Sequence, residues 1–304
     1  MLMIRNLFQA RCEDRAKVIT VIEQPLEWIQ SALTGTQTTR SFHFLVSWTA
    51  NPPCTAGPLW MARLLMATHD REIEAATDET VRVAVEAADL RRAWMPLSSL
   101  AERLGTGAEC VLLPEYQAKT VDADSPVWRV SWTAPDTMQL SGGSVRELAE
   151  HIRRIRGGDA ALGSKGLIYG TSAVECWLSR TGDIFPGDCD CLLCENDEPR
   201  VIIELKKHTL HGPIGDNLAS KYYPVPDGRK FDALFALQRR CQEVYGRDVP
   251  IAVVYYATRF RAVRVQMIAW REGALVVQRD SGDVVYQDPR TDQVGARIVR
   301  YVLR

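Results

Sequence analysis

Two neighbouring stretches decide the fold: residues 186–193 read PGDCDCLL, and residues 201–206 read VIIELK. Both are short and largely apolar, and the polar sequence ENDEP at residues 195–199 separates them, which predicts a β-hairpin. Acidic and basic residues interrupt both runs. Charged side chains are almost never fully buried unless they are paired or bind a metal. We therefore expect the hairpin to carry the chemistry of the protein.

Side chains two residues apart on a strand share one face, so Glu204 and Lys206 point the same way. Pairing of the two strands brings Asp190 beside Glu204. Two carboxylates and an ammonium group in one cleft can hold a hard cation, Mg²⁺ or Mn²⁺, with a water beside it. We expect the Leu205 carbonyl to add a third oxygen ligand and Lys206 to orient the water or stabilise transition-state charge. The alternative is an exposed edge hairpin with an ordinary surface ion pair.

This pattern resembles the PD-(D/E)XK nuclease superfamily, whose fold many restriction enzymes and repair nucleases share. The matching residues are Asp190 and the triplet Glu204, Leu205 and Lys206, and the second acid follows the first by 14 positions. The resemblance covers roughly residues 165–260. It implies an α/β fold with a restriction-endonuclease-like mixed sheet flanked by helices. It also implies a metal-dependent hydrolase of phosphodiester bonds.

Two further acids have more than one interpretation. In the superfamily an upstream helix often supplies an additional acid, and Glu175 in the sequence TSAVECWL at residues 171–178 matches that place. If Ser172 begins the helix, however, Glu175 stands at its third position and completes a capping box. Asp188 competes with Asp190 for the metal, because both lie on one face of the strand. We favour Asp190, which lies further into the strand, and expect Asp188 to shape the preceding turn or to assist the metal.

Four cysteines near the predicted site raise the alternative of zinc or an iron–sulfur cluster; they are Cys176, Cys189, Cys191 and Cys194. Alternation along the strand directs Cys189 and Cys191 away from Asp190 and into the core, where cysteine is common. No second close pair of Cys or His completes a site in the sequence. We therefore expect core thiols rather than metal ligands.

Several polar residues after the hairpin are candidates for substrate contact. His208 ends the second strand and either meets a phosphate or is a solvated strand end. Lys221 and Tyr222 lie in a loop over residues 211–229, where basic and aromatic side chains suit backbone contact and base stacking; a loop with its tyrosines folded back is the alternative. Gln238 matches a position at which some members of the superfamily carry a substrate-facing glutamine, although their Gln-x-x-x-Tyr motif is not reproduced.

A segment rich in Pro, Gly, Ser and Asp, residues 134–144, predicts a domain boundary. We expect residues 1–140 to form an α+β accessory domain of unknown family, for recognition, oligomerisation or partner binding. Residues 145–304 would form the nuclease-like domain. In the first domain we expect strands at 42–49, 110–114 and 127–133 and helices at 59–68 and 78–94. In the second we expect helices at 144–156, from 171 or 172, and at 231–245, a buried strand at 249–257 and a hairpin over 263–279.

Charge is uneven along the chain: residues 1–150 carry a net charge of −5 and residues 151–304 one of +4. The basic half contains the nuclease-like motif, and a polyanionic substrate favours that sign. The eight cysteines in 304 residues, without an export signal, lead us to expect reduced thiols and a cytoplasmic protein. No apolar run reaches the length of a membrane span.

These observations together predict a Mg²⁺-dependent endonuclease. We expect it to act on DNA rather than RNA, and restriction or anti-phage defence is the context suggested by analogy with the superfamily. One alternative is a non-catalytic module that binds nucleic acid or protein on a nuclease-like fold. The other is an unrelated α/β scaffold with an accidental E-x-K sequence. No P-loop motif is present, so we expect no ATP-driven motor in this chain.

Overall fold

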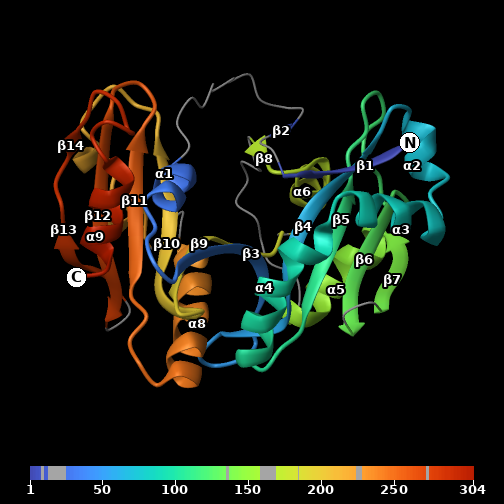
Figure 1. Ribbon diagram of the computed structural model, residues 1–304, viewed down its shortest axis with the longest axis horizontal. Helices are drawn as coiled ribbons and strands as arrows, with labels where there is room; N and C mark the ends of the chain where they lie inside the picture. Colours follow the sequence, from blue (N-terminus) through green and yellow to red (C-terminus); the bar gives the residue numbers. More distant parts are fainter. Residues whose placement is uncertain are drawn as a thin grey trace. The chain divides into compact units, whose positions relative to one another are not determined.

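The computed structural model describes residues 1–7, 10–12, 25–134, 137–157, 169–183, 185–223, 228–271 and 274–304. Within these ranges the chain is an α/β protein with a large mixed β-sheet flanked by helices (Figure 1). It divides into two compact units. Unit 1 comprises residues 1–18, 42–51 and 56–186, and unit 2 comprises residues 19–41, 52–55 and 187–304.

The strands of unit 2 follow the hydrogen-bonded order β13-β12-β11-β10-β9-β3. They are β3 (Gln37–Ser47, up to residue 41), β9 (Gly187–Glu195), β10 (Glu198–His208), β11 (Ile251–Ala257), β12 (Ala262–Arg271) and β13 (Ala274–Asp280), with β14 (Val284–Val285) beside β12. Strands β9 and β10 form the predicted antiparallel hairpin, in which Ile203 lies opposite Cys191. Strand β11 runs parallel to β10, and helix α8 (Gly228–Tyr245) connects the two.

The hairpin forms because its turn sequence tolerates left-handed backbone. Asn196 and Asp197 have φ angles of 53° and 61°, and they are the two residues between the paired Glu195 and Glu198. A two-residue turn with positive φ at both positions matches the twist of the flanking strands, and Asn and Asp accept that conformation more readily than most residues. The turn starts the pairing at Glu195 and Glu198, and an irregularity between Pro199 and Val201 then shifts the register by one residue, so that Ile203 pairs with Cys191.

Helices cover both faces of the unit 2 strands. On one face Cys191, Val201 and Ile203 pack in an apolar cluster with α1 (Pro25–Ser31) and α9 (Val294–Val302). Because neighbouring residues of a strand point to opposite faces, Glu204 and Lys206 lie on the other face, against α8. Two short helices, η1 (Ile214–Asp216) and α7 (Ala219–Tyr222), stand between β10 and α8 in the chain.

The strands of unit 1 follow the order β3-β4-β5-β6-β7. They are β3 (from residue 42), β4 (Cys54–Ala67), β5 (Ala108–Pro114), β6 (Pro126–Ala134) and β7 (Thr137–Ser144), with β1 (Leu2–Asn6) beside β4 and a separate pair of β2 (Ala10–Arg11) with β8 (Tyr169–Gly170). The helices are α2 (Asp70–Glu74), α3 (Asp78–Ala87), α4 (Leu90–Arg103), α5 (Val145–Arg156) and α6 (Ala173–Arg180). Leu148 and Ile152 of α5 and Leu178 of α6 pack with Trp60 and Val111 in the core of this unit.

Most of the predicted elements are confirmed. Strands lie over 42–47, 110–114 and 127–133, the hairpin and the helix over 231–245 are present, and β11 and the β12–β13 pair follow in the expected order. The helix predicted from Ser144 begins as expected: Ser144 and Glu147 form a reciprocal capping box, and Gly157, with φ 82°, ends the helix. The glycine-containing turn expected at residues 272–273 lies outside the described residues.

Two helix predictions in unit 1 are wrong. Residues 59–68 were expected to be helical, but they belong almost entirely to β4. Strand β4 is buried on both faces, for example at Trp60, Leu64 and Leu65, and a strand of that kind reads as a continuous apolar run that periodicity cannot distinguish from a buried helix. The single helix predicted over 78–94 is two helices, α3 and α4, separated at Asp89, which has a φ of 47°.

The two units also differ from the division expected between residues 140 and 145. Helices α5 and α6, which were assigned to the nuclease-like domain, pack in the core of unit 1. Helix α1, which was assigned to the accessory domain, packs in unit 2 against α9. The apolar face of each helix determines the unit in which it packs, and its position in the chain does not.

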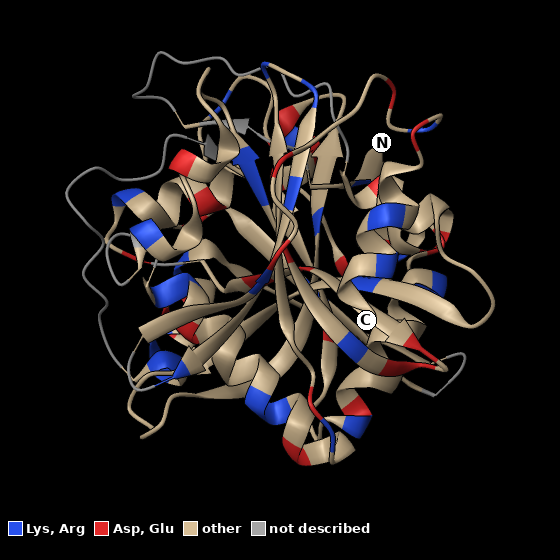
Figure 2. Cartoon of the chain, turned by 90° about the vertical axis from the view of Figure 1, so that its left-hand side faces the viewer, with Lys and Arg blue, Asp and Glu red and all other residues tan. Residues whose placement is uncertain are grey.

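Charge gives unit 2 little overall preference for a polyanion. Its three segments together contain 19 Lys and Arg against 18 Asp and Glu, so the excess expected from the second half of the chain is small in this unit. Blue and red segments are interspersed over the helices and strand ends (Figure 2). None of the helices in the described ranges is long and apolar enough to cross a membrane.

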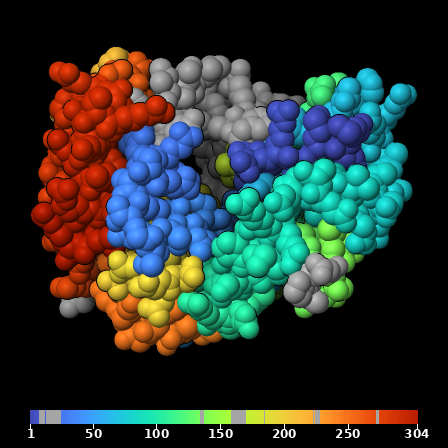
Figure 3. Space-filling view, in the orientation of Figure 1, coloured from blue at the N-terminus to red at the C-terminus, as the bar shows by residue number. Residues whose placement is uncertain are grey.

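A glycine lets α9 approach α1 closely. A Cβ atom at Gly295 would collide with the carbonyl group of Trp28 and lie 3.2 Å from the Cβ of Ala32. Figure 3 shows the surface around α1, in blue, beside the red C-terminal segment. The Trp28 ring also meets Tyr286 edge-on at 5.6 Å between ring centroids. The contact between the two helices thus depends on the absence of a side chain at one position.

We expect Gly295→Ala to lower the free energy of unfolding by about 1–3 kcal/mol, because the added methyl group overpacks this contact. A loss of stability would be informative, because helix propensity alone would make the alanine variant more stable by about 1 kcal/mol. Urea unfolding would measure the change. Gly107→Ala is the control: a Cβ there has its nearest neighbour at 3.9 Å and its φ is not left-handed. A Gly295→Ala protein as stable as the wild type would contradict the proposed close contact.

Candidate metal centre

Three carboxylates and two lysines come together where the hairpin meets the start of α8. Strand β9 supplies Asp188 and Asp190, strand β10 supplies Glu204 and Lys206, and the first turn of α8 supplies Lys230. Ile203 pairs with Cys191 in the hairpin, and one further step along the ladder sets Asp190 opposite Glu204. We call these five residues, Asp188, Asp190, Glu204, Lys206 and Lys230, the carboxylate–lysine cluster.

Lys230 is the residue that joins the acids. Its Nζ atom lies 2.7 Å from Oε1 of Glu204 and 3.2 Å from Oδ1 of Asp188. The Glu204 side chain is only 2% exposed, whereas that of Lys230 is 33% exposed. The ammonium group therefore reaches from the surface to a carboxylate that is buried.

The second oxygen of Glu204 is left without a partner. Among the residues that the structure describes, Oε2 of Glu204 is buried and makes no hydrogen bond. The neighbouring Asp190 is better satisfied, because its Oδ2 accepts a hydrogen bond of 2.8 Å from the backbone N–H of Leu205. A buried carboxylate oxygen without a donor costs free energy, and sites that keep such an atom are candidates for ligand binding.

Burial and mutual repulsion disturb the titration of the acids. Burial, and then the charge of Glu204, hold the pKa of Asp190 well above its ordinary value, although Lys230 and the Leu205 N–H oppose this. Burial also raises the pKa of Glu204, against the opposing effect of Lys230. Burial alone would lower the pKa of Lys230, but the three carboxylates outweigh it and raise that pKa well above its ordinary value. Lys230 thus stays an ammonium ion.

Lys206 occupies the same face of β10 as Glu204, as its position in the sequence predicts. Its Nζ atom lies 5.4 Å from the ring centroid of Phe231, over the aromatic face, and its charge helps to lower the pKa of Glu204. A cation over an aromatic ring is stabilised electrostatically. Lys206 is therefore held beside the buried carboxylate by the first turn of α8.

The donors of the cluster fit a hard divalent cation. Asp188, Asp190 and Glu204 offer only carboxylate oxygens, which Mg²⁺ and Mn²⁺ prefer, and Oε2 of Glu204 is open. As they stand, no three His, Cys, Asp or Glu side chains in the described part of the chain are arranged to hold one metal ion. The ammonium of Lys230 lies between two of the carboxylates. A metal-ligand role for the Leu205 carbonyl stays a prediction.

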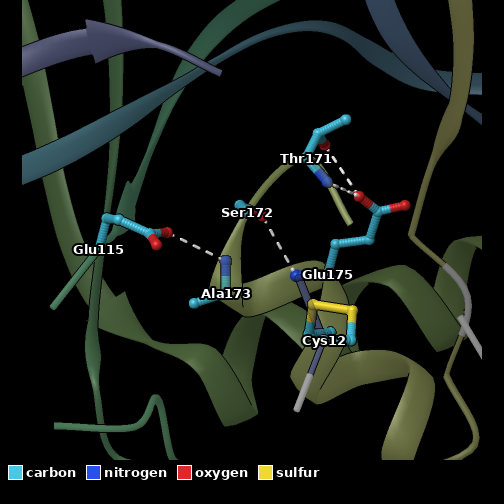
Figure 4. The surroundings of a disulfide bond; sticks show 7 residues. Cys12, Glu115, Thr171, Ser172, Ala173 and Glu175 are labelled. Carbon is cyan, nitrogen blue, oxygen red and sulfur yellow. Dashed lines mark hydrogen bonds between the residues drawn. A yellow bond between two sulfur atoms is a disulfide. The ribbon is translucent and has the colours of Figure 1, made fainter. Parts of the chain in front are cut away.

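Glu175 works locally at the start of α6, in unit 1. Its backbone N–H donates to Oγ of Ser172 at 3.2 Å, and its carboxylate accepts hydrogen bonds from the N–H and the hydroxyl of Thr171 (Figure 4). The N-terminal cap predicted at Ser172 is therefore confirmed, with the carboxylate bonded to Thr171 in place of Ser172. A metal-binding role of Glu175 stays a prediction.

The expectation that all eight cysteines are free thiols is wrong for two of them. Cys12 and Cys176 form a disulfide bond (Figure 4). The pairing of β2 with β8, in which Ala10 lies opposite Gly170, brings the two cysteines together. Cys176 is therefore committed to Cys12 and does not join the cysteines of β9.

The cysteines of β9 are neutral core residues. Cys189 and Cys191 are 1% and 0% exposed, and Cys191 packs in the apolar cluster beneath α1 and α9. Burial holds the pKa of the Cys189 thiol well above its ordinary value. A thiol must lose its proton to bind zinc or iron, so this environment suits packing better than metal ligation.

Two of the predicted substrate contacts are engaged in local structure. His208 is 5% exposed, its Nε2 lies 2.8 Å from the carbonyl oxygen of Gly212, and its ring meets Phe260. The alternative of a solvated strand end is wrong, because β11 continues beside β10 up to Ala257. Gln238 donates a hydrogen bond of 2.8 Å to the carbonyl oxygen of Val249.

The remaining predicted substrate contacts are Lys221 and Tyr222. Lys221 donates a hydrogen bond of 2.8 Å to the carbonyl oxygen of Asp216. The side chain of Tyr222 lies outside the described residues. Asp188 lies in the carboxylate–lysine cluster, where it pairs with Lys230.

Lys230 is the site residue that the sequence argument missed, and the sequence holds one signal of it. A positive charge in the first turn of a helix is unfavourable, because the helix N-terminus is itself positive. The sequence GRKF at residues 228–231 places two basic residues there. Basic residues at a helix start need acidic partners nearby, and the preceding strand supplies Glu204.

Comparisons with known proteins add no relative. No protein-family model matches the chain, and no curated protein or solved structure matches it. The carboxylate–lysine cluster is therefore the feature from which a function can be proposed.

The raised pKa of Asp190 predicts how the stability of the protein depends on pH. The folded state holds the proton at pH values where the unfolded carboxyl, with a pKa of about 3.9, has lost it. This contribution to stability is complete below the unfolded pKa and is lost as the pH rises through the folded pKa. In Asp190→Asn the amide oxygen still accepts the Leu205 N–H, but the titration is gone. We expect its unfolding free energy in EDTA to fall less steeply than that of the wild type between about pH 4 and pH 8.

Urea unfolding at a series of pH values would measure this slope. Glu243→Gln is the control, since its side chain is 64% exposed in α8 and pairs only with the exposed Arg240; exposed pairs of that kind contribute little. Parallel stability curves for wild type and Asp190→Asn would show that Asp190 titrates as an ordinary carboxyl group.

Proposed function

We propose that this protein is a divalent-metal-dependent nuclease whose centre is the carboxylate–lysine cluster. The observation that carries the proposal is the buried carboxylate of Glu204, which has one oxygen unpartnered and lies among two further acids and two lysines. Strained or uncompensated arrangements of this kind concentrate at functional sites. Three carboxylates on two paired strands repel one another, and this repulsion costs free energy unless a cation binds them.

The order of elements supports the same proposal. Helix α6, the hairpin β9–β10, helix α8 and strand β11 follow one another, and β11 runs parallel to β10. This is the order that the resemblance to the PD-(D/E)XK superfamily implies. We infer a restriction-endonuclease-like arrangement around the hairpin, with Asp190, Glu204 and Lys206 in the roles of the acid and the E-x-K pair.

Three residues of the cluster each have a task that their geometry allows. Asp190 is oriented by the Leu205 N–H, so that its other oxygen is available, and Glu204 offers Oε2. A divalent cation bound to these oxygens would polarise a phosphodiester and lower the pKa of a water. Lys206 is a compact positive charge beside them, suited to orient the water and to stabilise the negative charge that develops on the phosphate oxygens. DNA is the substrate that the resemblance suggests.

One observation favours the alternative of a non-catalytic binding module. Lys230 already neutralises Glu204 and Asp188, and a cluster whose charge is permanently balanced would need no metal. The two proposals differ in a single assay: incubation with plasmid, linear duplex, single-stranded DNA and RNA, in Mg²⁺, Mn²⁺ or EDTA. Cleavage that requires the metal supports the nuclease, and no cleavage of any substrate supports the module.

We expect Asp190→Asn and Glu204→Gln each to abolish cleavage while leaving the fold intact, because each removes an anionic ligand. Lys206→Ala should lower the cleavage rate on the order of 10²–10³ with little change in substrate binding, as is typical for loss of a group that stabilises the transition state. Rates from single-turnover cleavage and affinities from fluorescence anisotropy would separate the two effects.

Lys207→Ala is the matched control for Lys206→Ala. The two lysines are adjacent on β10 and their side chains point to opposite faces. An inactive Lys207→Ala protein together with an active Lys206→Ala protein would show that the assigned face is wrong. Full activity of Asp190→Asn or Glu204→Gln would exclude the cluster as the catalytic centre.

A further inference from the structure

Lys230 has no place in the E-x-K pattern, yet its ammonium group contacts two of the three carboxylates in the cluster. Its ammonium lies 2.7 Å from Glu204 and 3.2 Å from Asp188. Both distances are those of charge-assisted contacts. The position between two carboxylates is the position that a bound cation would take.

The helix does not hold Lys230 there. Lys230 is the third residue of α8, where the partial positive charge of the helix N-terminus repels an ammonium group. The ion pairs with Glu204 and Asp188 oppose that repulsion. If a stronger cation satisfied Glu204 and Asp188, the contacts of Lys230 would lose their advantage.

The side chain can also leave. It is 33% exposed, and a lysine carries its charge on a flexible chain of four carbons. Glu204, in contrast, is 2% exposed and lies in the middle of β10, so it cannot turn towards water. A divalent cation that takes Oε1 of Glu204 together with Oδ1 of Asp188 must therefore displace Lys230.

We propose that Lys230 is the resident counter-ion of the cluster, and that it competes with the divalent cation for Glu204 and Asp188. In the metal-free protein the ammonium offsets the repulsion among the acids and stabilises the fold. When the cation binds, Lys230 swings out towards solvent, where a polyanionic substrate would be. The proposal rests on the proposed function for the identity of the cation, but not for the competition itself.

Lys230→Met tests the competition, because it keeps the length of the side chain and removes the charge. In EDTA we expect a lower melting temperature than for the wild type, since Glu204 and Asp188 lose their partner. Titration with Mn²⁺, followed by the EPR signal of the free ion, should show affinity higher by on the order of tenfold or more, because the competing charge is gone. Saturating Mn²⁺ should restore the melting temperature.

Two control variants separate competition from general effects. Lys230→Arg keeps the charge and should bind Mn²⁺ no more tightly than the wild type. Arg229→Met changes the net charge of the protein by the same amount at the neighbouring exposed position and should leave the Mn²⁺ affinity unchanged. If Lys230→Met binds Mn²⁺ as weakly as the wild type, or more weakly, the competition is excluded.

A measurement on the wild type covers the case in which Lys230→Met fails to fold. Acetylation of lysines by a water-soluble active ester, read by mass spectrometry, should modify Lys230 slowly in EDTA and faster in Mg²⁺, while Lys221 reacts equally in both. An unchanged or slower reaction of Lys230 in Mg²⁺ would overturn the proposal. If Mn²⁺ competition and faster labelling are seen without any cleavage, the counter-ion role of Lys230 is supported and only the nuclease function is refuted. If cleavage requires the metal but the labelling of Lys230 is unchanged, the nuclease function is supported and the counter-ion role is refuted.

Discussion

The ion pair between Lys230 and Glu204 is the constraint on which the rest of the site depends. A carboxylate that is 2% exposed cannot stay ionised inside a protein without a partner. The partner comes from the first turn of α8, so this helix must begin directly over β10. That placement puts Phe231 beneath the ammonium of Lys206 and brings Lys230 to Asp188 as well. The position of one helix start thus follows from one buried charge, and the geometry of the whole cluster follows from the helix start.

The parts of the structure that the sequence predicted are those with a local cause. The turn at Asn196 and Asp197, the capping box of Ser144 and Glu147, and the alternation that places Glu204 and Lys206 on one face each depend on residues only a few positions apart. The role of Lys230 was missed because its partners lie on two strands that precede it by 26 and 42 positions. The disulfide between Cys12 and Cys176 was missed for the same reason, with a separation of 164 positions.

The failure at β4 has a different origin. Its apolar run carries no period, because neighbouring strands and helices bury both of its faces, and only the tertiary arrangement decides between helix and strand. The domain boundary predicted between residues 140 and 145 differs from the division into units, because composition says little about where a helix packs. Helices α5 and α6 each have one apolar face, and that face packs in the core of unit 1. Residues 134–144 read as a linker, yet most of them form strands β6 and β7.

The pairing of α1 with α9 bears on how the chain is made. Helix α1 spans residues 25–31 and its partner α9 spans residues 294–302, so the first helix of unit 2 leaves the ribosome long before the last. Until α9 follows, Trp28 and Ile29 have no apolar surface of that helix to cover them. Contacts between such distant segments form late and slowly. Unit 2 therefore completes its apolar cluster only after synthesis has reached α9.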